Sequence, residues 1–379
     1  EVVDIVSAWL AARGLPVELV VADADVSNVV SDVTGVRPGR HVVFNAHMDT
    51  MPEGDTRLWT VPPFALTRRD GRVYGLGMGN MKGALAAMCV ATAAINRRRD
   101  RLAGKLSLTA VSDEVMFGDR GTVLLLDRRP DLRGDFLISG EGPGYMGLAV
   151  AEKGLLWLDV EAHGESGHSS RAREGVTAPI MLARFLAEVD RLNGFRCEVP
   201  ADLLEVDGGE GDVGLRLSIN VGSLEAGGVR SQIAPTASAQ LDVRLPPGID
   251  VEEVEALICA RIPPGATITV RRIKAWNANW TGIGTPLARA LAEAAEIVRG
   301  TAAVPVVRLP GSDARRWRDL GVPALCYGPQ PTLSAGIDDH TLERDLIDCA
   351  RIYARTALRL MESQGSRNAT PESVANDEV

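Results

Sequence analysis

The chain has 379 residues, of which 45% are hydrophobic and 24% charged, a composition typical of a globular protein and a length that suits two domains. The net charge of −9 argues against nucleic-acid binding, and no apolar run has the length expected of a membrane span or the pattern of a signal peptide. Five cysteines without Cys-x-x-Cys spacing argue against a disulfide framework and predict a reducing, cytoplasmic environment.

The first 153 residues predict an α/β unit. Near-continuous apolar runs indicate buried strands, and apolar residues at helical spacing indicate helices. The expected strands lie at residues 17–21, 42–46, 105–111 and 136–140, and the expected helices at 2–13 and 84–96. This order predicts a mixed, mostly parallel sheet with acidic residues at the ends of its strands.

The pattern changes at Gly154. Alternating strands at 154–162, 215–224, 238–245 and 267–273, with helices at 178–192 and 251–262, predict an α+β insert. From residue 286 the first pattern returns, with helices at 287–299 and 342–362 and strands at 304–309 and 324–327. We therefore expect an α/β domain made of residues 1–153 and 275–362, interrupted by an α+β domain of residues 154–274. Residues 363–379 are polar and predict a disordered tail.

A histidine at the end of a buried strand is the first candidate for a functional residue. His47 follows the strand at 42–46, and open α/β sheets bind ligands at the carboxyl ends of their strands. Asp49 lies two residues later, where its side chain can hydrogen-bond the far imidazole nitrogen and fix the tautomer that binds a metal.

Several motifs follow His47-x-Asp49 in a specific order. They are Tyr74-Gly-x-Gly-x-x-Asn80-Met-Lys-Gly83, Asp113-Glu114, Glu141, Gly167-His168, Gly311-Ser-Asp313 and His340. Their combination resembles the M20 metallopeptidases, which include carboxypeptidases, aminoacylases, acetylornithine deacetylases and succinyl-diaminopimelate desuccinylases. The resemblance implies a zinc-peptidase-like catalytic domain interrupted by a lid, or dimerisation, domain, with two zinc ions at the carboxyl edge of the sheet.

The resemblance also implies roles for the matched residues. His47 and Glu141 match the ligands of one metal ion, and His340 matches a ligand of the other. Glu114 matches the general base that deprotonates water and later protonates the leaving amine.

Two carboxylates of the family pattern are missing. Asn80 stands at the position of the aspartate that bridges the metal ions, and Val115 at the second glutamate after Asp113. An alternative register would make Asp113 the base and Glu114 a ligand. Two dications ~3.5–4 Å apart repel each other, and a neutral amide does not bridge them as a carboxylate does. We therefore predict one zinc ion, held by His47, Glu141 and Asn80 with His340 nearby, or no metal, rather than a zinc pair.

Other matched positions concern the substrate. His168 matches a lid histidine that reaches the oxyanion in the neighbouring subunit of a homodimer. Gly311, Ser312 and Asp313 match a loop that meets the substrate carboxylate. Arg244 matches a lid arginine that recognises carboxylates. The family's lid asparagine falls on Gln232 by one spacing and on Ser231 by another.

Three functions remain open on these residues. The first is M20-like cleavage of the amide bond of an N-acyl amino acid or a small peptide-like substrate, with an atypical mononuclear or metal-free site. The second is metal-independent acyl transfer, condensation or cyclisation in a biosynthetic pathway. The third is a dimeric pseudoenzyme. The acyl group, the amine and the pathway do not follow from the sequence.

Overall fold

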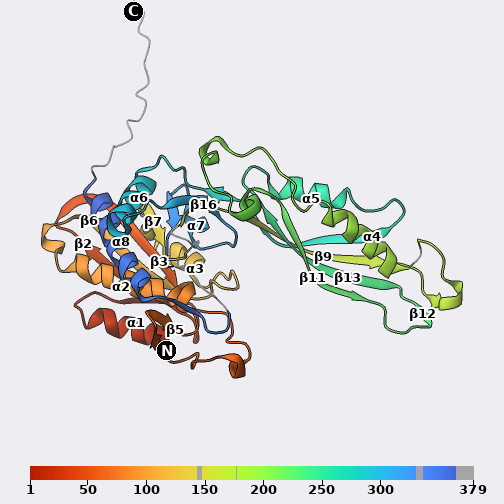
Figure 1. Ribbon diagram of the computed structural model, residues 1–379, viewed down its shortest axis with the longest axis horizontal. Coiled ribbons are helices and arrows are strands. Elements are labelled where there is room, and N and C mark those ends of the chain that lie inside the picture. The colour runs from red at the N-terminus through yellow and green to blue at the C-terminus, as the bar shows by residue number, and fades with distance from the viewer. Residues whose placement is uncertain (143–146, 176, 330–335, 364–379) are drawn as a thin grey trace, which may run out of the picture.

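The computed structural model describes residues 1–142, 147–175, 177–329 and 336–363, and most of the predicted tail lies outside these ranges. The described chain forms two lobes (Figure 1). The larger lobe contains the first 153 residues and the C-terminal segment, and the elongated smaller lobe contains the middle of the chain.

A nine-stranded sheet forms the centre of the larger lobe. Its strand order is β1-β2-β6-β3-β7-β17-β8-β15, and β16 also pairs with β8. The strands are β1 (Glu18–Val21), β2 (Ser27–Thr34), β3 (Arg37–His47), β6 (Ala103–Val111), β7 (Phe136–Ser139), β8 (Gly147–Glu152), β15 (Asn279–Trp280), β16 (Val304–Arg308) and β17 (Ala324–Cys326). The central strands β6, β3, β7 and β17 run parallel to one another, whereas β1, β2 and β15 pair antiparallel. The predicted mixed α/β sheet is confirmed, and its parallel part lies in the middle.

Helices cover both faces of this sheet. One layer contains α1 (Val2–Ala11), α2 (Gly83–Asn96), α6 (Pro286–Arg299) and α8 (Glu343–Glu362), and the other face carries α3 (Thr122–Arg128) and α7 (Ala314–Asp319). The packing of strand β3 explains the near-continuous apolar run at residues 42–46. Val42 and Phe44 pack into the first layer, whereas Val43 packs against Trp317 of α7 on the other face.

One helical segment is long and apolar enough, by length and composition alone, to match a membrane span. It runs from Met78 to Asn96, over 19 residues, and 67% of it is buried inside the protein. Helix α2, which makes up most of this segment, packs against α8 and strand β3. The segment is therefore accounted for as a core helix of the larger lobe.

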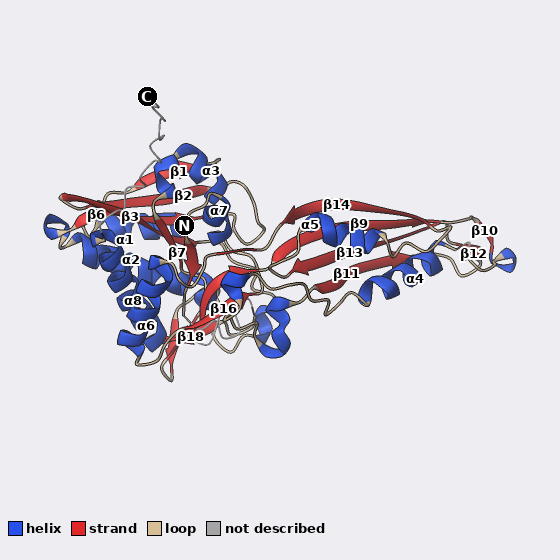
Figure 2. Ribbon diagram, turned by 90° about the horizontal axis from the view of Figure 1, so that it is seen from above, coloured by secondary structure: helices blue, strands red, loops and turns tan. Residues whose placement is uncertain are grey.

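The smaller lobe contains a four-stranded antiparallel sheet with the order β11-β13-β9-β14. Its strands are β9 (Gly154–His163), β11 (Ser218–Ala226), β13 (Thr236–Leu245) and β14 (Thr267–Trp276). Helices α4 (Ala178–Asp190) and α5 (Val251–Cys259) pack on one face through a separate apolar core. A small two-stranded antiparallel sheet of β10 (Gly167–His168) and β12 (Gln232–Ile233) lies at the end of the lobe farthest from the large sheet (Figure 2).

A small three-stranded sheet brings distant parts of the chain together. It contains β4 (Thr67–Arg69), β5 (Arg72–Tyr74) and β18 (His340–Leu342), in the order β18-β5-β4. His340 pairs with Tyr74 in this sheet. The C-terminal segment that carries His340 is therefore held next to the glycine-rich loop that follows β5.

Candidate active site

Three parallel strands deliver the central residues of the site. His47 is the last residue of β3, which lies between β6 and β7. Glu114 follows the end of β6, and Glu141 follows the end of β7. Because the carboxyl ends of parallel strands meet at one edge of the sheet, the three side chains converge there.

The three side chains form a compact, buried cluster. His47 Nε2 lies 3.3 Å from Glu141 Oε1 and 3.7 Å from Glu114 Oε2. One ligand atom from each residue lies within 4.8 Å of the others, and all three residues are buried. His47 Nδ1 lies 2.9 Å from the carbonyl oxygen of Asp49, which can only accept a hydrogen bond. The ring therefore presents Nε2 to the two carboxylates.

Asp49 acts differently from the sequence expectation. Its carboxylate lies 3.6 Å from His47 Nδ1, so the hydrogen bond to the imidazole is made by the backbone carbonyl instead. Asp49 Oδ2 accepts a hydrogen bond from the backbone N–H of Val115, at 2.9 Å. This contact holds the turn after β6 and thereby positions Glu114.

The turn after β6 also separates the two acidic residues that the sequence left as alternative bases. Asp113 has a φ of 63° and pairs with Arg120, at 3.1 Å, away from the cluster. Glu114 enters the cluster. Val115 lines the cavity of about 400 Å³ next to the cluster, called the hollow below, and its side chain has no atom that could bind a metal ion. This geometry favours the register in which Glu114 is the acid and base.

Asn80 lies on the glycine-rich loop at the edge of the same hollow. It is extended, with φ −142° and ψ 101°, inside the turn Met78–Lys82. The buried carboxylate of Asp339 accepts hydrogen bonds from the N–H groups of Gly77, at 2.8 Å, and Gly79, at 2.9 Å. Asp339 therefore fixes the backbone that presents Asn80.

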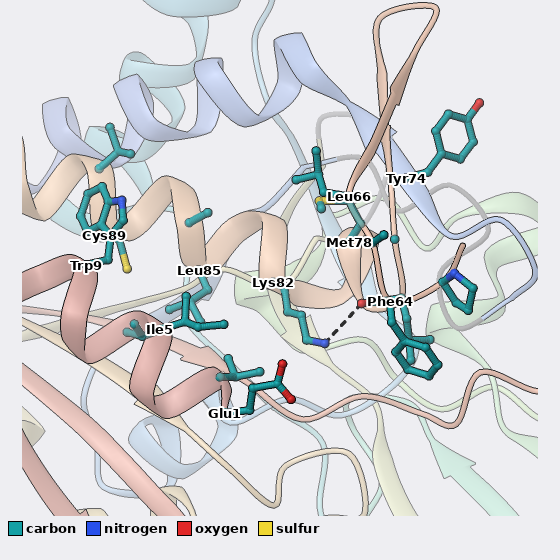
Figure 3. Close-up of a pocket in the computed structure, with 18 residues that line it drawn as sticks. Glu1, Ile5, Trp9, Phe64, Leu66, Tyr74, Met78, Lys82, Leu85 and Cys89 are labelled. Carbon is teal, nitrogen blue, oxygen red and sulfur yellow. Dashed lines mark hydrogen bonds between the residues drawn. The ribbon is translucent and has the colours of Figure 1, made fainter. Parts of the chain in front are cut away.

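The other side of this loop faces a different hollow, of about 630 Å³, next to α1 (Figure 3). Trp9, Leu85 and Phe64 contribute to its apolar lining. Lys82 points into it, and its Nζ donates to the carbonyl oxygen of Leu76 at 3.3 Å. The loop thus separates an apolar hollow from the hollow that contains the acidic cluster.

His340 lies beside this loop but outside the three-residue cluster found among the described residues. Its ring packs on Tyr74, with the ring centroids 4.7 Å apart, and its Nδ1 lies 2.8 Å from the carbonyl oxygen of Asp338. This carbonyl contact resembles the one that orients His47. The role of His340 as a metal ligand remains a prediction.

The loop matched to the substrate carboxylate surrounds the cluster on another side. Gly311 lines the hollow, and buried Ser312 donates from its N–H to Glu152 at 2.9 Å. Asp313 accepts a hydrogen bond from Thr122 at 2.6 Å, and burial raises the pKa of Asp313 to about 6. Ser312 and Asp313 therefore hold the loop, and Gly311 is the part that faces the hollow.

The two predicted lid groups lie in different places. Arg244 lines the hollow and forms a two-bond pair with Asp242, with Nε–Oδ1 at 2.7 Å and Nη2–Oδ2 at 2.9 Å. His168 and Gln232 pair with each other in the two-stranded β10–β12 sheet, at the far end of the smaller lobe (Figure 2). Within one chain, the structure therefore brings Arg244 to the cluster and leaves His168 and Gln232 distant from it.

Arg308 is a residue of the site that the sequence reasoning missed. It is the last residue of β16, is buried, and lies with its Nη2 2.5 Å from Glu141 Oε2. The sequence signal for it was an arginine within the otherwise apolar run 304–309. This run directly precedes Pro310 and Gly311. Such a buried cation requires a counter-charge, although the sequence does not say which one.

Burial and neighbouring charges perturb the whole cluster. Burial and the Glu141 charge raise the pKa of Glu114 well above its usual range. Burial also acts on Glu141, but the charges of Arg308 and His47 outweigh it and hold the pKa of Glu141 below its usual value. At His47, burial is outweighed by the three carboxylates around it, and the pKa of the imidazole is raised well above 6.5. Glu141 is therefore ionised, while Glu114 and His47 compete for a proton.

The cluster offers donor atoms for one cation. His47 Nε2 is buried without a hydrogen-bond partner, and carboxylates of Glu114 and Glu141 adjoin it. The imidazole of His47 and the carboxylate of Glu141, with one further ligand, would make up the three protein ligands of a catalytic zinc site. A second ion would need further carboxylates, where the chain has Asn80 and Val115. This is the only cluster of three such ligand groups among the described residues.

Comparison with known proteins places these observations in a family. The model of peptidase family M20/M25/M40 matches residues 43–359. The succinyl-diaminopimelate desuccinylase of Paracoccus denitrificans is 27% identical over 338 residues, which cover 85% of this chain and 83% of that enzyme. The acetylornithine deacetylase of Buchnera aphidicola is 27% identical over 217 residues, which cover 57% and 54% of the two chains.

Solved structures share the fold across nearly the whole chain. An M20 family metallo-carboxypeptidase from Sulfolobus solfataricus superimposes with a TM-score of 0.74 at 18% identity, over 95% of this chain and 93% of that one. A di-peptidase from Saccharomyces cerevisiae has a TM-score of 0.71 at 15% identity, over 96% and 90%. The family match spans both lobes and contains every residue of the acidic cluster, so the chain belongs to peptidase family M20/M25/M40.

Proposed function

We propose that this chain hydrolyses the amide bond of an N-acyl amino acid or a small dipeptide-like substrate, with Glu114 as the general acid and base. Membership in the M20 family, whose relatives here are named hydrolases, identifies the chain as an enzyme that acts on small amides. The observation that carries the more specific proposal is the buried Glu114 carboxylate, with its raised pKa, at the edge of the hollow.

The raised pKa suits Glu114 to both halves of the reaction. The Glu114 carboxylate accepts a proton from the attacking water, whose oxygen bonds to the amide carbon. Glu114 then donates that proton to the leaving amine as the C–N bond breaks, and a carboxylic acid and an amine are released. A general base works best when its pKa is near the working pH, which burial and Glu141 favour here.

A single metal ion would be held by His47 and Glu141, with Asn80 and His340 as the further predicted ligands, while Glu114 stays free to act as the acid and base. When bound, it would act as a Lewis acid that polarises a carbonyl and lowers the pKa of water. His47 is oriented for this role by the Asp49 carbonyl. We propose that the site binds no second ion.

The hollow next to the cluster suits a small substrate with an apolar part. It measures about 400 Å³, and Met116, Phe117 and Trp157 contribute to its lining. The Asp242 pair holds the guanidinium of Arg244 in a fixed orientation at its edge. We propose that Arg244 and the loop at Gly311 meet the substrate carboxylate.

We further propose that the chain acts as a homodimer in the cytoplasm. His168 and Gln232 lie far from the cluster of their own chain, which supports a role in the site of a partner subunit. All five cysteines are free, as expected in a reducing compartment.

The test is a pair of matched variants assayed on N-acyl amino acids and dipeptides. Glu114→Gln should lower kcat by ~10²–10⁴-fold, because general acid–base catalysis contributes about that much. Asp113→Asn, the control, changes the adjacent carboxylate, which pairs with Arg120 outside the cluster, and should leave kcat near the parent value. Equal turnover of Glu114→Gln and the parent would refute the proposal.

The same assay separates the two rival functions. Glu114-dependent acyl transfer or cyclisation without amide hydrolysis would support a repurposed enzyme. Binding of these amides without turnover, and without an effect of Glu114→Gln, would support a pseudoenzyme.

A further inference from the structure

One charged side chain in the hollow has no counterpart among the ligands expected from the family resemblance. Arg308 is only 6% exposed and lines the hollow that also contains Glu114 and Glu141. Its Nη1 donates to the carbonyl oxygens of Pro310, at 3.0 Å, and of Gly311. These two carbonyls hold the guanidinium in a fixed orientation, with Nη2 2.5 Å from Glu141 Oε2.

The two carboxylate oxygens of Glu141 face different partners. Its Oε1 faces His47 at 3.3 Å, and its Oε2 faces Arg308 at 2.5 Å. A carboxylate that is neutralised by a guanidinium attracts a metal ion less strongly, and the guanidinium itself repels a dication at short range in a buried site. Arg308 therefore competes with a metal ion for the charge of Glu141.

The cluster can balance its charges without any dication. Glu141 contributes a negative charge, and Arg308, with its Nη2 2.5 Å from Glu141 Oε2, contributes the positive charge that compensates it. Asn80 and Val115, at the two positions where the family resemblance expects carboxylates, contribute no charge.

We propose that Arg308 is a built-in cation that takes over the charge-neutralising role of a metal ion at Glu141. The site then binds at most one zinc ion, weakly, and keeps its arrangement when zinc is removed. Arg308 is a positioning residue in this account, because it acts by holding and neutralising Glu141. The proposal rests on the proposed active site but not on its substrate, so its test uses zinc alone.

The test compares zinc binding by the metal-stripped parent, Arg308→Met and Arg299→Met, measured by calorimetry or chelator competition. Arg299→Met is the matched control, because Arg299 is also paired, with Asp345 at 2.8 Å, and is partly buried, but lies outside the hollow. Arg308→Met should bind zinc at least tenfold more tightly than the parent, whereas Arg299→Met should match the parent. A zinc affinity of Arg308→Met equal to or below that of the parent would overturn the proposal.

Arg308→Gln keeps a donor for Glu141 without the positive charge and covers the case in which Arg308→Met does not fold. It should also bind zinc more tightly than the parent, and Arg308→Lys, which keeps the charge, should not. Tighter binding by Arg308→Lys than by Arg308→Gln would contradict the charge argument. A failure of amide hydrolysis in the parent would leave these zinc affinities unaffected, so the two proposals fail separately.

Discussion

Replacing Arg308 with methionine should destabilise the protein in a pH-dependent manner. The ion pair with Glu141 is almost completely buried, with side-chain exposures of 6% and 3%. Removing one partner of a buried pair leaves the other charge uncompensated, which typically costs about 3–5 kcal/mol. We expect a loss of this size in the free energy of unfolding of metal-free Arg308→Met near pH 7.5.

The pH dependence follows from the fate of Glu141. In the parent, Arg308 and His47 hold the pKa of Glu141 below its usual value. Without Arg308, burial should raise the pKa of Glu141 above its value in the unfolded chain. A group whose folded-state pKa is raised destabilises the fold as the pH rises above the unfolded pKa. The loss should therefore be small near pH 4.5 and complete near neutrality.

Urea denaturation of parent and variant at pH 4.5 and 7.5 measures this difference. Excess zinc should restore part of the stability of Arg308→Met at pH 7.5, because a ligand that binds only the folded state stabilises it. A loss that is the same at both pH values, or that zinc leaves unchanged, would refute the assignment of Arg308 as the counter-charge of Glu141.

Three further predictions concern catalysis, metal binding and the junction between the lobes. On the acid side of its pH profile, kcat/KM should fall with a midpoint above pH 4.5, because burial and the charge of Glu141 raise the pKa of Glu114. A midpoint below pH 4.5 would argue against Glu114 as the base. The double variant Asn80→Asp with Val115→Glu restores two carboxylates. Native mass spectrometry should show one more zinc ion per chain in this variant than in the parent. An unchanged zinc count would mean that these two positions do not form the second metal site. Burial lowers the pKa of Lys153 to about 8 in the folded protein, from 10.5. Between these two pH values the folded chain has lost the Lys153 proton and the unfolded chain still holds it. The free energy of unfolding should therefore increase as the pH rises from 8 toward 10.5. Lys153→Met should remove that rise in urea titrations, and a rise of the same size in the variant would contradict the assignment.

Much of the fold could be predicted from local patterns. The parallel centre of the sheet followed from apolar runs such as 42–46, and the smaller lobe from the alternation that begins at Gly154. Strands β2 and β8 and helices α3 and α7 were not predicted. Strand β2 interrupts its apolar residues with Ser31 and Asp32, and Asp32 forms an ion pair with Lys105 of β6.

Only those residues of the candidate site that belong to a recognisable sequence motif could be predicted. His47, Glu114 and Glu141 each follow a buried strand, so their convergence followed from parallel pairing. Arg308 lies 167 positions from Glu141, and no local pattern predicts which buried partner a single arginine selects. The Arg244–Asp242 pair, by contrast, follows from strand geometry, because residues two apart point to the same face of a strand.

The most direct test of this account is the zinc content of the purified parent, measured by native mass spectrometry before and after chelation. The account predicts at most one zinc ion per chain, which a chelator removes while the circular dichroism spectrum and the dimer mass stay unchanged. Two zinc ions per chain that persist through chelation would contradict it.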